Sequence, residues 1–237
     1  MRYLWFGWLL AVGSSSCISP AKQQASTTVN IRWDRDPESL SPIVLPNQYA
    51  TDAANLLYCS LLQVDASTGA FSPALADSLP QVRLLGDSVS HLRYRLRRTA
   101  AWDSGRPVLA TDVAFTLKLL FCPGLPNEKM GASLRFIRDI KLDYANPRRF
   151  TLVCRGQAPE FSFESGDFPI VPEDALDPTH SLRQLSLASV AAASAATPGP
   201  ALAALVKRYQ QADLGRHPER LPGCGPYELA AWKLNQL

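Results

Sequence analysis

Hydrophobic and polar positions alternate most regularly along residues 91–97, where leucine and tyrosine are separated by arginines. That period of two predicts a strand with one buried face. Residues 103–105 read Asp-Ser-Gly, which favours a turn because aspartate can bond its own backbone and glycine accepts a positive φ. Residues 110–121 then carry apolar side chains at helical spacing, with Asp112 in the first turn, where a carboxylate stabilises a helix. The pattern predicts a strand, a turn and a helix in that order.

The same reasoning predicts elements along the rest of the chain. The expected strands and hairpins cover residues 29–33, 62–65, 82–97 with a turn at 86–88, 140–144, 149–154 and a strand that starts at 227–229. The expected helices cover residues 52–62 and 201–213. The pattern does not decide the secondary structure of two stretches. Residues 133–140 fit a short helix or an extended segment, and residues 187–200 fit a helical insertion or a loop.

The first residues resemble an export signal. Arg2 precedes an apolar run over residues 3–12, and small residues follow at 13–16 before Cys17. The run is shorter than the roughly 20 apolar residues that span a membrane. A cysteine after small residues resembles a lipoprotein signal, which implies a lipidated Cys17, although Ser14 stands where such signals usually carry leucine. An ordinary cleaved signal with an incidental Cys17 is the alternative. Residues 18–28 are small and polar, as in a tether.

Composition changes this picture little. Hydrophobic residues make up 46% and charged residues 19%, which excludes disorder for most of the chain. A net charge of +3 gives no basic excess of the kind that nucleic-acid binding needs.

The cysteines and histidines bear on two questions: whether the chain forms disulfides and whether it binds a metal. With Cys17 lipidated, four cysteines remain, and they permit up to two disulfides among three pairings that the sequence does not choose between: Cys59, Cys122, Cys154 and Cys224. Buried free thiols are the alternative. Scattered histidines and the lack of a Cys-x-x-Cys motif give no indication of a metal site, and no cofactor is expected.

Residues 94–115 resemble the signature segment of the family 5 extracellular solute-binding proteins, the oligopeptide- and dipeptide-binding components of ABC importers. The residues that carry the resemblance are Tyr94, Leu96, Arg97, Trp102, Asp103, Gly105, Pro107, Ala110, Asp112, Val113 and Phe115. Further motifs of the family follow in the same order along the chain. They lie at residues 36–42, 62–78, 168–173 and 223–229, followed by Trp232. In the last of these motifs, Cys224 replaces the usual threonine.

The resemblance implies an α/β fold: a lobe of the type II periplasmic-binding-protein kind, with a mixed sheet and a small accessory α/β subdomain. The implied division is a signal at 1–17, a tether at 18–28, a first lobe segment at 29–48, the accessory subdomain at 49–168 and a lobe return segment at 169–237. Family members continue into a second large lobe. The sequence is therefore expected to correspond to their N-terminal portion, as a natural truncation or an incomplete gene model, with a sheet edge and an apolar face left uncovered.

The resemblance also implies the function. A substrate-binding lipoprotein on the periplasmic or cell-envelope face would capture a peptide for import by ABC permease subunits. Related proteins bind nickel, haem or sugars, so the ligand stays open. The residues expected to line the ligand cleft are Glu38, Ser39, Tyr49 and Trp232.

The sequence also bears on two other functions. A truncated, ligand-free envelope lipoprotein without a transport role is the alternative. A hydrolase using Ser104, His91 and Asp112 is not expected, because the chain has no Gly-x-Ser-x-Gly elbow.

Overall fold

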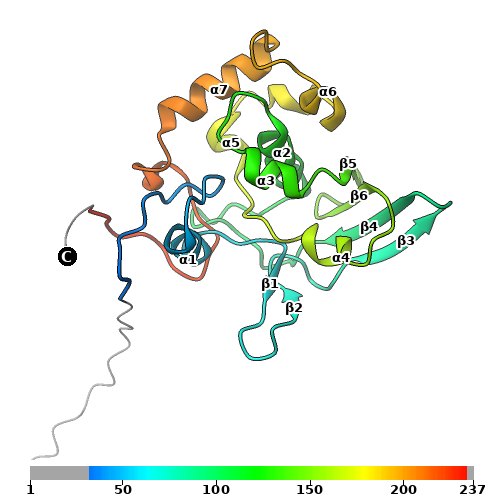
Figure 1. The fold of residues 1–237 in the computed structure, drawn as a ribbon, viewed down its shortest axis with the longest axis horizontal. Coiled ribbons are helices and arrows are strands. Elements are labelled where there is room, and N and C mark those ends of the chain that lie inside the picture. The colour runs from blue at the N-terminus through cyan, green and yellow to red at the C-terminus, as the bar shows by residue number, and fades with distance from the viewer. Residues whose placement is uncertain (1–31, 234–237) are drawn as a thin grey trace, which may run out of the picture. The chain divides into compact units, whose positions relative to one another are not determined.

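A four-stranded antiparallel sheet in the order β3-β4-β6-β5 forms the centre of the fold (Figure 1). The computed structural model describes residues 32–233, and those from Asp34 onward belong to one compact unit. The strands are β3 (Gln81–Leu85), β4 (Val89–Arg95), β5 (Ile137–Leu142) and β6 (Arg149–Arg155). The hairpin predicted over residues 82–97 is confirmed as β3 and β4, with Gly86 at φ 57° in its turn.

The alternation along β4 places one face of the strand in the core, as predicted. Leu92 and Tyr94 of the strand and Leu96 just after it are buried, and the arginines between them are exposed. The Tyr94 ring stacks on Phe150 of β6 with 5.3 Å between ring centroids. The Tyr94 hydroxyl lies 2.8 Å from the Ser165 hydroxyl, so the buried polar group of this tyrosine is satisfied.

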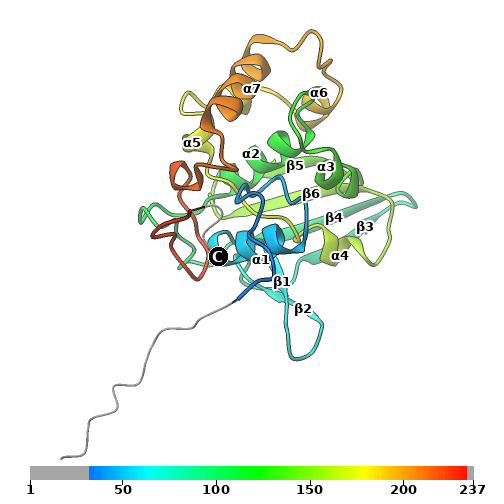
Figure 2. The same cartoon turned by 60° about the vertical axis from the view of Figure 1, so that its left-hand side comes forward.

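A second, two-stranded sheet precedes the larger one in the chain. It pairs β1 (Leu62–Val64) with β2 (Phe71–Pro73). Asp65 holds the intervening turn by accepting hydrogen bonds from the backbone N–H groups of Ser67 and Thr68. A turn at residues 66–68 therefore connects the two strands. Figures 1 and 2 both show this hairpin on the opposite side of the four-stranded sheet from α2.

Helix α2 (Ala110–Phe121) begins where the sequence predicts, directly behind the Asp-Ser-Gly turn. The sequence predicts an apolar stripe, but almost every side chain from Ala110 to Leu120 is buried. The reason is that α2 packs against β5 and also against other helices, which lie above the sheet in both views (Figures 1 and 2). These are α3 (Glu128–Ser133), α5 (Glu173–Leu176) and α6 (Leu187–Ala191).

The remaining helices complete the described fold. Helix α7 (Pro200–Ala212) matches the helix predicted at 201–213, and α6 shows that part of 187–200 is helical. The others are α1 (Gln48–Leu57), α4 (Phe161–Glu164) and the 3-10 turns η1 (Ser181–Gln184) and η2 (Pro218–Arg220). The stretch 133–140 divides between the end of α3 and the start of β5.

Three expectations about local structure need correction. Helix α1 covers Gln48–Leu57 rather than 52–62, because the Asn47 side chain accepts a hydrogen bond from the Ala50 N–H and starts the helix earlier. Residues 227–229 form no strand, because the Tyr227 N–H is bound to the Leu56 carbonyl instead of a ladder partner. The β5 strand begins at Ile137 rather than 140.

The α/β class is confirmed, and each strand pair among the described residues is antiparallel, so neither sheet is of the mixed type that the sequence led us to expect. The strand expected at 29–33 falls mainly outside the described residues, and Arg32 and Trp33 have no regular structure. The expected boundaries at 48/49 and 168/169 stay a prediction.

Candidate functional site

The carboxyl end of α1 meets the segment 223–227, which is far from it in sequence. The backbone N–H groups of Cys224 and Gly225 donate to the Leu57 carbonyl at 3.1 and 2.9 Å, and the Tyr227 N–H donates to the Leu56 carbonyl at 3.1 Å. The last carbonyls of a helix have no partner within the helix. Segment 223–227 therefore serves as the cap of α1.

Two glycines make this close approach possible. A Cβ atom on Gly223 would lie 2.4 Å from the Leu57 carbonyl oxygen, and one on Gly225 would lie 2.4 Å from the Leu56 carbonyl oxygen. Neither distance is compatible with a side chain, because the neighbouring atoms belong to the backbone of a helix end. The Gly-x-Gly spacing of this motif is thus a steric requirement of the cap.

The Asp-Ser-Gly turn joins the same place. The Asp103 carboxylate accepts a hydrogen bond from the Gly223 N–H at 2.8 Å, and the Asp103 N–H donates to the Gly223 carbonyl at 2.9 Å. Gly105 adopts φ 79° and closes the turn by donating to the Trp102 carbonyl. Two motifs that lie 120 residues apart are therefore in direct contact. We call the meeting of α1, this turn and segment 223–229 the motif junction.

A cleft of about 360 Å³ opens at the motif junction. Its lining residues are Leu57, Tyr58, Asp103, Ser104, Pro218, Glu219, Leu221, Pro222, Gly223, Glu228 and Leu229. Three of these side chains are carboxylates, and all three are exposed: Asp103, Glu219 and Glu228. The cleft can therefore accept hydrogen bonds and attract a cationic group such as an ammonium.

Two side chains of the cleft have shifted pKa values. Burial, followed by the nearby Cys224 and Asp103, raises the pKa of Tyr58, so this phenol stays protonated and can donate. The pKa of Glu219 shifts the other way: a backbone hydrogen bond and the His217 side chain, 3.0 Å away, lower it. The cleft thus combines a neutral donor, Tyr58, with an ionised acceptor, Glu219.

The four residues expected from the sequence to line a ligand cleft are not among those that line this one. Glu38 is exposed, and Tyr49 lies half-buried in the first turn of α1. Ser39 is buried, and its hydroxyl accepts from the Ser41 N–H at 3.1 Å, a local turn contact. Trp232 is half-buried near the end of the described residues. Their ligand-binding roles stay a prediction, and Cys17 lies outside the described residues.

Sequence reasoning missed Asp103 and Glu228 as cleft residues, although both belong to motifs that it used. The glycines of 223–225 were the feature of the sequence that could have indicated the site, because glycines at this spacing suggest that another backbone segment lies close to them. Nothing in the sequence says which backbone that is.

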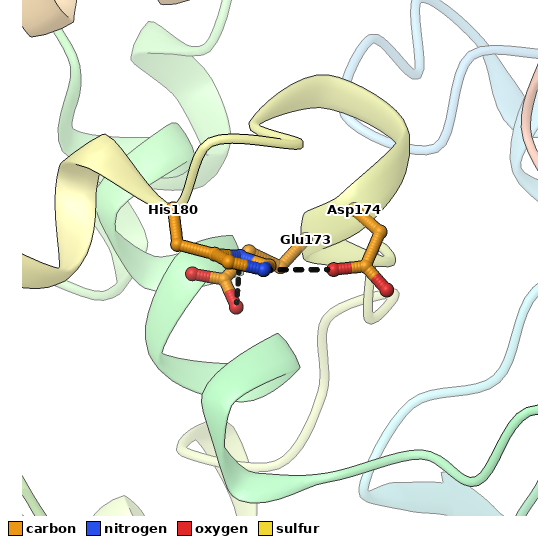
Figure 3. Close-up of side chains that lie close together, drawn as sticks. All are labelled: Glu173, Asp174 and His180. Atoms are coloured by element: carbon orange, nitrogen blue, oxygen red, sulfur yellow. Dashed lines mark ion pairs between the residues drawn. The ribbon is translucent and has the colours of Figure 1, made fainter.

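A second cluster of polar side chains lies between α5 and η1 (Figure 3). Glu173, Asp174 and His180 place one potential ligand atom each within 4.8 Å of one another. The His180 ring nitrogens lie 3.4 Å from the Glu173 carboxylate and 3.6 Å from that of Asp174. No pattern in the sequence indicated this grouping, because His180 appeared isolated.

Two arginines already balance the carboxylates of this cluster. Arg183 donates three hydrogen bonds to the buried Glu173 carboxylate, the shortest at 2.5 Å. Arg106 contacts Asp174 at 3.2 Å and Asp112 at 3.0 Å. A divalent cation would lie beside these two guanidinium groups and would be repelled. We therefore interpret the cluster as an ion-pair network that holds α5 against α2 and η1.

Asp112 connects that network to the start of α2. Its carboxylate is fully buried and accepts hydrogen bonds from the N–H groups of Leu109 and Glu173 at 2.9 and 3.0 Å, as well as from Arg106. The expectation that Asp112 stabilises a helix start is confirmed. It also joins α5 to α2 through the Glu173 N–H.

Each helix in the described part of the chain is too short or too polar to cross a membrane.

Comparison of the fold with solved structures gives consistent matches. An oligopeptide-binding protein from Thermus thermophilus, complexed with a pentapeptide, superposes with a TM-score of 0.61 at 17% identity, over 84% of this chain and 34% of that one. The chain has the fold of the oligopeptide-binding proteins.

Two further structures show the same likeness. The substrate-binding domain of an oligopeptide ABC transporter from Bacillus anthracis gives a TM-score of 0.60 at 14% identity, over 86% of this chain and 35% of that one. OppA of Burkholderia pseudomallei gives 0.57 at 18% identity, over 85% and 35%. This chain therefore spans about a third of the length of the proteins it matches. No family model and no curated protein matches it in sequence.

Proposed function

We propose that this chain forms one wall of the ligand-binding cleft of a solute-binding protein, which captures peptides or related small solutes for an ABC importer. The observation that carries the proposal is the motif junction. There, two motifs of the solute-binding resemblance meet beside a cleft, in a fold that matches oligopeptide-binding proteins. The proposed role is binding, without catalysis.

The chemistry of the cleft suits a short peptide. Its volume of about 360 Å³ lies at the lower end of the range for small-molecule sites, roughly 300–1,000 Å³. The exposed carboxylates of Asp103, Glu219 and Glu228 favour a peptide amino group. The hydroxyl of the largely buried Tyr58 and nearby backbone groups are suited to the peptide main chain, since extended peptides are held chiefly through main-chain hydrogen bonds.

A titration followed by amide NMR shifts tests the proposal. The isotope-labelled chain receives a pool of peptides two to five residues long, or glucose as the control solute, up to millimolar concentration. We expect peptide-dependent shifts confined to the lining residues 57–58, 103–104, 218–219, 221–223 and 228–229 and to their chain neighbours. Equal shifts with glucose, or none with peptides, contradict the proposal and favour a ligand-free envelope protein.

A charge variant sharpens the test. Glu228→Gln removes one carboxylate of the cleft, and Glu164→Gln removes another exposed carboxylate, on α4 and outside the cleft. We expect Glu228→Gln to weaken binding of peptides with a free amino group about two- to fivefold, as for an exposed ion pair. N-acetylated peptides, and Glu164→Gln, are expected to show no change.

The proposal includes export and a lipid anchor at Cys17. The support is in the sequence: Arg2, the apolar run at 3–12 and the serines at 14–16. Labelling of cells with a radioactive fatty acid tests the anchor. Incorporation is expected for the unaltered chain and is expected to be lost in Cys17→Ala. Equal labelling of both would mean that Cys17 carries no lipid. ABC permease subunits are the proposed partners of the anchored protein.

A further inference from the structure

Cys59 and Cys224 lie side by side, although 165 positions separate them in sequence. The Cys59 N–H points at the Cys224 sulfur at 3.4 Å, and the Cys59 thiol lies 2.7 Å from the Cys224 carbonyl oxygen. Cys59 follows the end of α1, and Cys224 belongs to the segment that caps α1. The same backbone hydrogen bonds that cap the helix therefore hold the two cysteines together.

The other two described cysteines have different surroundings. Cys122 and Cys154 are completely buried among apolar side chains, and burial raises their pKa values to about 11 and about 12. Thiols of this kind are unreactive because little thiolate forms. Cys59 and Cys224 are both only partly buried, so a reagent in solution can approach them.

We infer that Cys59 and Cys224 are a dithiol site that forms a disulfide by exchange with a small disulfide oxidant. The backbone contacts around the pair already bring the two residues within reach of one another, which is the geometric condition for a disulfide. The bond would fix segment 223–229 and the wall of the cleft covalently to the end of α1. This inference does not depend on the proposed ligand.

The exchange has a defined order. The Cys59 sulfur, as thiolate, attacks one sulfur of the oxidant; the oxidant S–S bond breaks, and one thiol leaves with a proton. The Cys224 sulfur then loses its proton and attacks the Cys59 sulfur, which expels the second thiol. Two protein thiols are oxidised by two electrons, and one disulfide oxidant is reduced to two thiols.

Electrostatics supports Cys59 as the attacking group. A hydrogen bond from the Cys224 side chain lowers the pKa of Cys59 against the opposing effect of burial. The same interaction, with burial, raises the pKa of Cys224, which therefore keeps its proton until the second step.

Peptide mapping tests the inference on the full chain. The reduced protein is equilibrated with glutathione buffers of increasing oxidised fraction, and remaining thiols are trapped with N-ethylmaleimide. We expect a cross-linked peptide that joins Cys59 to Cys224, with a mass two hydrogen atoms below that of the reduced pair, while Cys122 and Cys154 stay reduced. If both Cys59 and Cys224 are alkylated in excess oxidised glutathione, or either is cross-linked to Cys17, the inference is wrong.

Two variants test the order of attack. Cys224→Ser is expected to stop at a mixed disulfide between Cys59 and glutathione. Cys59→Ser is expected to leave Cys224 largely unmodified. The reverse pattern overturns the assignment of Cys59 as the attacking thiol. If either variant fails to fold, the mapping of the unaltered chain still decides whether the bond forms.

Thermal unfolding supplies an independent measurement. A disulfide that closes a loop of this length should raise the melting temperature of the oxidised chain by about 5–10 °C over the reduced chain. The shift is expected to vanish in both serine variants. An oxidised chain that carries the mapped cross-link but melts no higher than the reduced chain would show that the bond does not hold the segment to α1.

Discussion

Individual carboxylates hold this fold together by accepting backbone hydrogen bonds from distant segments. Asp103 accepts from Gly223 and Asp112 accepts from Glu173, whereas Asp177 accepts from the nearby Leu182 and holds its own loop. A hydrogen bond to a charged group contributes about 1.5–3 kcal/mol, more than a neutral one, because the ionised acceptor binds more strongly. Such residues fix loops that have little apolar surface to bury.

Asp177 should make stability depend on pH. Burial alone would raise its pKa, but hydrogen bonds from Leu182, Ser181 and Thr179 outweigh burial and lower the pKa below its ordinary value. The folded state therefore favours the ionised carboxylate. This stabilisation is fully present above the unfolded pKa of about 3.9 and is lost as the pH falls through the folded pKa.

We expect Asp177→Asn to lower the free energy of unfolding at pH 7 by about 1.5–3 kcal/mol. Below pH ~4 the difference from the unaltered chain should shrink, because the carboxyl of the unfolded chain takes up a proton there, whereas the native carboxyl is protonated only at lower pH. Denaturant melts across pH measure both effects. Asp87→Asn, in the exposed β3–β4 turn, is the control and should change neither. A pH-independent cost of Asp177→Asn would contradict the assigned cause.

Trp102 should contribute strongly to stability, because its side chain is buried beside the Asp-Ser-Gly turn with only 2% exposed. Trp102→Ala is expected to cost about 3–5 kcal/mol. Tyr144, an aromatic residue with 99% exposed, is the matched control, and Tyr144→Ala should cost less than about 0.5 kcal/mol. Urea denaturation compares the two. Similar small costs for both variants would mean that Trp102 is not packed as described.

At the scale of elements, the end of α1 depends on a segment from the other end of the described chain. The Leu56 and Leu57 carbonyls have acceptor sites that the helix cannot fill, and segment 223–227 fills them. Helix α2 is held differently, by apolar packing on nearly all sides and by Asp112 at its start. Damage to segment 223–227 should therefore affect α1 before α2.

Gly225→Ala tests the cap. The added Cβ would lie 2.4 Å from the Leu56 carbonyl oxygen, so the segment must move away and the hydrogen bonds to α1 must lengthen. We expect a loss of about 1–3 kcal/mol, with faster hydrogen exchange confined to α1. Gly199→Ala, where a Cβ meets no atom within 4 Å, should cost at most about 1 kcal/mol. Equal costs at both positions would refute the steric account.

At the scale of the whole molecule, the proposed function makes the described chain one wall of a ligand cleft. Its matches with known binding proteins cover about a third of their length. A ligand held on one face gains part of the contacts of an enclosing pocket, while the entropy loss on binding, at least ~4 kcal/mol, is nearly unchanged. We therefore expect this chain to bind short peptides with a dissociation constant well above micromolar. Isothermal titration with a mixed peptide library measures it, and micromolar or tighter binding would show that this face suffices.

Elements with a local pattern could be predicted from the amino-acid sequence. The alternation along 91–97 became β4, the helical spacing at 201–213 became α7, and the Asp-Ser-Gly turn formed where expected. These predictions succeed because a buried face imposes its period on the residues that carry it. The order of motifs also indicated the fold that the solved structures show.

The candidate site depends on contacts that no local pattern records. The sequence shows the glycines of 223–225. It does not show that the end of α1 occupies the space that they leave, or that this contact replaces the strand expected at 227–229. In the same way, the sequence permitted three cysteine pairings, and the fold placed Cys59 beside Cys224. The physical reason is that a local pattern records which face of an element is buried, whereas its partner is chosen by packing and hydrogen bonding among segments far apart in the chain.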